Sequence, residues 1–137
     1  PYFEEKYPQD YRPRKAIETL RTWIQTGEFK MKDIRESSLA AHTAAREVKE
    51  GDYIARSAAR AAGQAVATAH VPTHAVGAAV YAATAIRDAT GSVNEKVNKE
   101  RDWQYKHLLY LNKKSGANSC AIQNLWRGPD KNMKRKF

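Results

Sequence analysis

Alanine at helical spacing is the feature that most constrains how this chain folds. When each residue of the segment 52–70 advances by 100° around a helix, Ile54 and five alanines gather on one side. Arg56 and Arg60 lie on the other side. Alanine is the best helix former, and its small side chain lets neighbouring helix axes approach closely. The pattern therefore predicts tightly packed helices joined by thin apolar interfaces.

Larger apolar side chains are scarce, since Leu, Ile, Val and Phe together make up 22 of the 137 residues. With a net charge of +9, that scarcity alone would indicate a disordered chain. The 22 alanines reverse this interpretation because they follow helical periodicity. We therefore predict an all-α fold, a compact bundle or solenoid-like array of about five alanine-rich helices.

Local start and stop signals divide the chain into these helices. Pro13 suits a first helical turn, Gly27 suits a helix end, and Asp52 can cap the helix that follows it. No charge occurs between Ala75 and Ile86, so we expect that helix to be enclosed by its neighbours at the centre of the domain. The expected helices cover about 13–26, 31–50, 52–70, 72–89 and 94–113, with a short one near 122–126.

The positive charge is concentrated towards the C-terminal end. Residues 113–137 carry seven Lys and Arg against Asp130, a net of +6, so the preceding 112 residues carry +3 of the total +9. We expect a helical domain over residues 1–112 and a basic, weakly structured tail over residues 113–137. The opening PYFEEKYP resembles the end of a helix, so we also expect a first helix upstream of residue 1.

Two histidines lie four residues apart in the stretch ATAHVPTHA, with a proline between them. On one continuous helix, His70 and His74 would share a face, as paired metal ligands do. Pro72 argues against this, because proline removes a helical hydrogen bond and pushes the preceding residue out of the α region. We expect one helix to end near His70 and the next to begin at Pro72, which makes the histidines structural residues at a corner.

A pocket for an anion or small molecule is the alternative reading of the same region. It would combine this corner with His42 and Arg46, which are four residues apart on an earlier helix, and with Tyr81, on the same side of its helix as His74. A metal site is less well supported, because there is no Cys pair, no HExxH motif and no carboxylate near HVPTH. No GxSxG turn, P-loop or dinucleotide motif occurs. We therefore assign no catalytic residue, no metal and no cofactor. The candidate ligand-binding residues are His42, Arg46, His70, His74 and Tyr81.

The single cysteine, Cys120, cannot form a disulfide within the chain, which favours a reducing compartment such as the cytoplasm. The alanine-rich span 54–89 is interrupted by charged residues and by proline, so it does not predict a membrane helix. We expect no membrane partner, and we expect nucleic acid as a partner only through the basic tail.

Four blocks of the sequence carry a resemblance to a known family. They are FEEKYPQDYRPRKAIE (3–18), AAHTAAREV (40–48), ARSAARAAGQAVATAHVPTHAVGAAVYA (55–82) and ERDWQ (100–104). Together they are similar to a family of small helical immunity proteins of bacterial toxin systems, of the immunity-protein-five-like type. The tail beyond about Leu109 does not resemble the ending of that family.

The resemblance implies a bacterial binding protein that neutralises a cognate, co-encoded toxin by stoichiometric contact. Such a protein is not an enzyme and needs no catalytic residue. An uncharacterised ligand-binding protein or enzyme with a His/Arg pocket is the alternative, and a homo-oligomer remains open.

Overall fold

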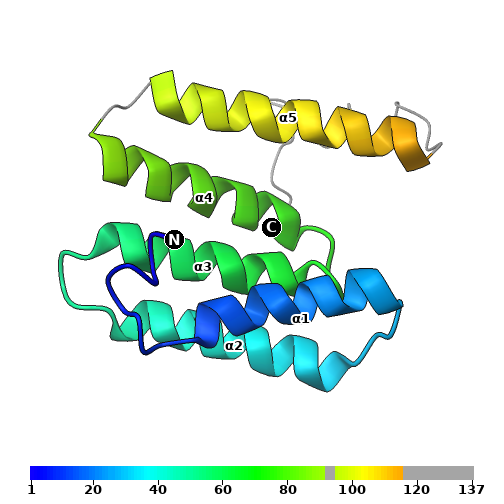
Figure 1. Cartoon of the computed structure of the whole chain (residues 1–137), viewed down its shortest axis with the longest axis horizontal. Helices are drawn as coiled ribbons and strands as arrows, with labels where there is room; N and C mark the ends of the chain where they lie inside the picture. Colours follow the sequence, from blue (N-terminus) through cyan, green and yellow to red (C-terminus); the bar gives the residue numbers. More distant parts are fainter. Residues whose placement is uncertain (92–94, 116–137) are drawn as a thin grey trace, which may run out of the picture. The chain divides into compact units, whose positions relative to one another are not determined.

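The computed structural model describes residues 1–91 and 95–115. These residues form five helices, so the prediction of an all-α fold is confirmed (Figure 1). No helix in the described ranges has both the length and the apolar character needed to cross a bilayer. The helices are α1 (Arg12–Thr26), α2 (Met31–Glu47), α3 (Tyr53–Ala67), α4 (His74–Thr90) and α5 (Glu95–Ser115).

The bounds of α1 follow from its sequence signals. Pro13 lies in its first turn, where the missing N–H of proline leaves no helical hydrogen bond unmade. Gly27 ends the helix at a φ of 71°, a left-handed conformation that glycine adopts without steric cost. Its N–H donates to the carbonyl of Trp23 at 2.8 Å. Both predicted ends of this helix are therefore confirmed.

Residues 1–101 form one compact unit in which α3 occupies the centre. Helix α3 packs against α1, α2 and α4, with α1 lying in front of α2 and α3 (Figure 1). The prediction that residues 72–89 form the enclosed central helix is wrong, because Val76 and Val80 on α4 are 55% and 51% exposed. The absence of charge between Ala75 and Ile86 did not indicate burial, because alanine is tolerated at exposed helical positions.

Small side chains make up most of the core. The largest fully buried side chains are Ile34 of α2 and Val66 of α3, and alanines surround them. The buried side of α3 is turned away from the predicted one, which leaves Ile54 only half-buried. One core cluster comprises Phe3, Ala44, Ala45, Val48, Ala55 and Ala59, and the other comprises Ala16, Ile34, Ala41, Ala62 and Val66.

The unit that begins at residue 102 is described up to residue 115, within α5. Trp103 stacks on His107 along this helix, with ring centroids 5.1 Å apart. The short helix predicted near 122–126 lies outside the described residues, as does the tail from residue 116 onward.

Candidate functional site

The histidine corner lies between α3 and α4, and Pro72 does interrupt the helix there. Helix α3 ends at Ala67, and α4 begins at His74. His70 lies in the intervening turn, where its N–H donates to the carbonyl of Ala67 at 3.1 Å. The imidazole rings of His70 and His74 are 5.7 Å apart at their centroids and inclined by 43°. The two rings are therefore neighbours that come from different elements.

Each ring at this corner has a different polar environment. The Nδ1 atom of His74 lies 2.6 Å from Oε1 of Gln64, which links the start of α4 to α3. The Nδ1 atom of His70 is buried and has no hydrogen-bond partner within the described part of the chain. The first contact ties two helices together, while the second leaves one ring nitrogen unsatisfied.

His42 reaches the same region from α2. Its ring packs directly on Gly63 of α3, where a Cβ atom would lie 2.9 Å from the His42 Nε2 atom. One turn earlier on α2, the Ser38 hydroxyl donates to the Gly63 carbonyl at 3.0 Å. Burial of the His42 ring lowers its pKa, and the positive charges of Arg46 and Arg60, followed by His74, lower it further. The imidazole of His42 is therefore held towards its neutral form.

The structure brings only part of the predicted set together. Arg46 is exposed, and its guanidinium donates to Thr43 Oγ1 at 2.6 Å. The guanidinium carbon of Arg60 lies over the ring of Tyr81, 5.6 Å from the ring centroid. The sequence analysis did not predict the connecting role of α3, although it placed Arg56 and Arg60 on the polar side of that helix. In the part of the chain that the structure describes, no three His, Cys, Asp or Glu side chains form a group that could hold a metal ion.

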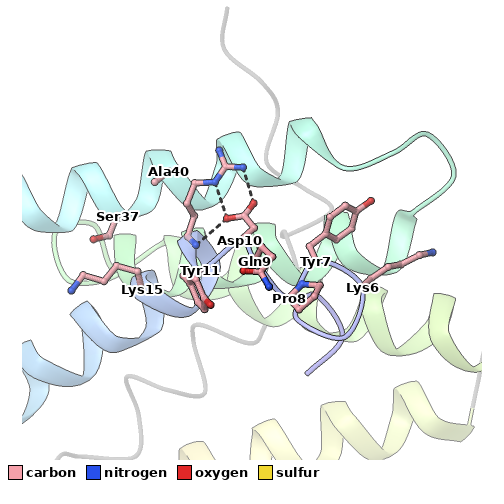
Figure 2. A pocket seen from close by; sticks show the side chains of 10 residues that line it. Lys6, Tyr7, Pro8, Gln9, Asp10, Tyr11, Lys15, Ser37 and Ala40 are labelled. Atoms are coloured by element: carbon pink, nitrogen blue, oxygen red, sulfur yellow. Dashed lines mark hydrogen bonds and ion pairs between the residues drawn. The ribbon is translucent and has the colours of Figure 1, made fainter.

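A second feature, which the sequence did not indicate, is an open groove of about 900 Å³ beside the N-terminal segment. Figure 2 shows Tyr7, Pro8 and Tyr11 along one side of it and Ala40 of α2 on the other. Asp10 accepts hydrogen bonds from Arg12, at 2.9 Å from Nε and 2.7 Å from a terminal nitrogen, and these bonds lower the pKa of its carboxyl group.

The N-terminal segment that forms this groove is anchored to the helices. Phe3 is buried in the core, and Asp52 accepts hydrogen bonds from the Lys6 ammonium and the Tyr7 hydroxyl. Asp52 does occupy the N-cap position of α3, but its side chain makes no capping hydrogen bond. The prediction that Asp52 caps α3 through its side chain is therefore wrong, because Lys6 and Tyr7 engage the carboxylate instead.

The comparisons with known proteins gave one match. A family model described as Imm-5 like putative immunity protein matches residues 1–110. No curated protein and no solved structure matches the chain.

Proposed function

The chain belongs to the family of Imm-5 like putative immunity proteins, and on this premise we propose that it neutralises a bacterial toxin by binding it stoichiometrically in the cytoplasm. The observation that carries the proposal is the extent of the family match. Residues 1–110 include α1 to α4 and most of α5, so the relationship concerns the helical scaffold as a whole and not one short motif.

A protein that blocks its partner by contact needs a surface that stays in place when the partner binds. The described surface of residues 1–101 rests on closely packed alanines and on an N-terminal segment held by Asp52. These features favour a binding protein whose side chains are held in position before contact. They require no bound cofactor and no chemical step.

The direct test is co-expression with a candidate toxin gene taken from beside the gene for this chain, in a host that the candidate kills. We expect growth to be restored and the two purified proteins to form a complex of defined stoichiometry on a sizing column with light scattering. An unrelated helical protein of the same size, expressed at the same level, is the control. Continued killing together with separate elution of the two proteins would refute the function.

A ligand-binding role for the histidine corner is the second candidate, and the unpartnered Nδ1 atom of His70 is the observation that favours it. Its ligand would be a small anion held by His42, Arg46, His70 and His74, with Tyr81 beside them. Titration with inorganic phosphate, followed through the histidine ring protons by NMR, tests this role. Saturable shifts of at least two of the rings would support it, and unchanged rings would exclude phosphate as a ligand.

A further inference from the structure

The outward side of α3 carries a row of polar and aromatic side chains on a helix whose opposite side is core. Tyr53, Arg56, Arg60 and Gln64 recur at intervals of three or four residues, which places them on one face. The buried residues Ala55, Ala59, Ala62 and Val66 lie on the other face, in the clusters that contain Phe3 and the α1 residue Ala16. Helix α1 and the N-terminal segment lie on the opposite side of α3. Helix α4 borders the polar side, where Gln64 contacts His74 and Arg60 lies over Tyr81. Tyr53, at the start of the row, is 58% exposed.

Two guanidinium groups on this face lie over tyrosine rings. Arg56 lies 5.7 Å from the ring centroid of Tyr53, and Arg60 lies 5.6 Å from that of Tyr81 on α4. Such a cation–π contact leaves the guanidinium N–H groups available for hydrogen bonds to a carboxylate. It also restricts the long side chain in advance, which lowers the entropy lost on binding.

These arginines form no ion pair within the described ranges. Across residues 1–91 and 95–115, the same is true of Arg46 on α2. By contrast, Arg12 and Arg14 are paired with carboxylates. The positive charges of Arg46, Arg56 and Arg60 are therefore not neutralised by ion pairs within the described residues.

We propose that this face is the docking surface for the toxin, and that the toxin presents carboxylates to it. The inference rests on the proposed function and specifies the chemistry of the partner. Arginine and tyrosine are the residue types that dominate binding energy at protein interfaces. We call this surface the basic face; its residues are Arg46, Tyr53, Arg56, Arg60, Gln64 and Tyr81.

Other occupants fit the basic face less well. A second copy related by twofold symmetry would bring the same positive charges against each other. Residues 113–137 carry a net charge of +6, so they too would be repelled. Single-stranded nucleic acid matches the sign of charge, but it binds such surfaces by stacking bases on ring faces. A guanidinium group already lies over one face of the Tyr53 ring and one face of the Tyr81 ring, so stacking there is less favoured.

Charge reversal on the basic face tests the inference. Calorimetry with the purified product of the candidate toxin gene should give a dissociation constant about 30-fold weaker for Arg60→Glu and about tenfold weaker for Arg56→Glu. Arg21→Glu is the matched control, because this exposed arginine on α1 likewise has no ion pair within the described ranges, and it should change the constant by less than about twofold. Circular dichroism checks that each variant is folded, and Arg60→Gln provides a milder change if Arg60→Glu is not.

The results separate the docking surface from the function. If the wild type binds tightly and neither Arg56→Glu nor Arg60→Glu weakens binding, the basic face is not the docking surface. The proposal that the protein binds the toxin would still stand. Failure of the wild type to bind the toxin would overturn both. A third outcome is that the wild type binds an oligo-dT probe and not the toxin, with Arg56→Glu and Arg60→Glu abolishing that binding. This outcome would overturn the acidic protein partner in favour of nucleic acid. Weakening by both variants but not by Arg21→Glu would support the inference.

Discussion

His74 and Gln64 join α4 to α3 through a 2.6 Å contact between the Nδ1 and Oε1 atoms. The side chain of Gln64 also covers Gly77 of α4, where a Cβ atom would lie 3.0 Å from the Gln64 Cδ atom. We expect Gln64→Ala to lower the free energy of unfolding by about 1 kcal/mol, because it removes this hydrogen bond from a half-buried site. Urea denaturation measures the change. Gln25→Ala at an exposed position of α1 is the control, and equal effects of the two substitutions would contradict the prediction.

Because His42 contacts Gly63, we expect the effect of Gly63→Ala on stability to depend strongly on whether His42 is present. In the wild type, Gly63→Ala should destabilise the protein, because the new methyl group would meet the His42 ring at 2.9 Å. In a His42→Ala background, the same substitution should stabilise α3 by about 1 kcal/mol, since alanine is the better helix former. Thermal unfolding of the wild type, the two single variants and the double variant measures the coupling. An identical effect of Gly63→Ala in both backgrounds would rule out the contact.

The lowered pKa of His42 makes stability depend on pH. Because its pKa in the folded state lies below the ordinary value of 6.5, the unfolded chain takes up a proton first as the pH falls. The contribution of His42 to stability is therefore present above that value and is lost progressively as the pH falls below it. We expect His42→Gln to reduce the loss of stability between about pH 7.5 and about pH 5, a range above the titration of most carboxylates. Parallel curves for the two proteins would disprove the effect.

Close packing of alanine predicts intolerance of larger side chains. Ala59 of α3 is fully buried and belongs to the cluster around Phe3. Ala59→Leu should therefore cost about 1–3 kcal/mol of stability through overpacking, and Ala83→Leu on α4 should behave similarly. Ala75→Leu, at an exposed position of α4, should be nearly neutral. Denaturant unfolding compares the three variants, and a stable Ala59→Leu protein would show that the packing is looser than described.

The Asp52 anchor predicts a specific local change. Asp52→Ala should release the N-terminal segment, because it removes the acceptor of both the Lys6 and the Tyr7 hydrogen bonds. We expect faster hydrogen exchange at the amides of Lys6 and Tyr7, which donate to the carbonyl of Phe3 in the intact segment. Protection within α1 should be unchanged and serves as the internal control. Unaltered exchange near residue 7 would mean that burial of Phe3 alone holds the segment.

The features that the sequence predicted correctly depend on local backbone chemistry. Pro13 and Gly27 marked the ends of α1, and Pro72 marked the break before α4, because each acts through its own φ angle or missing N–H. These signals require no knowledge of distant residues. They were sufficient for the number of helices in the described residues and for most of their bounds.

The features that the sequence did not reveal depend on contacts between distant segments. Asp52 has a residue type and position typical of a helix cap, but its carboxylate accepts a hydrogen bond from Tyr7, 45 residues away. The uncharged run in α4 suggested full burial, yet Val76 and Val80 are exposed because α4 packs mainly against α3. The link from Arg60 to Tyr81 likewise appears only when two antiparallel helices are set side by side.

The two sides of α3 place different constraints on substitution. The alanines on its inner side must keep their size if the neighbouring helices are to stay close, whereas the exposed Tyr53 can change with little effect on that spacing. If the basic face binds the toxin as proposed, its exposed side chains can change while the scaffold stays constant. A new binding specificity would then require exchange of only a few side chains on an unchanged helix.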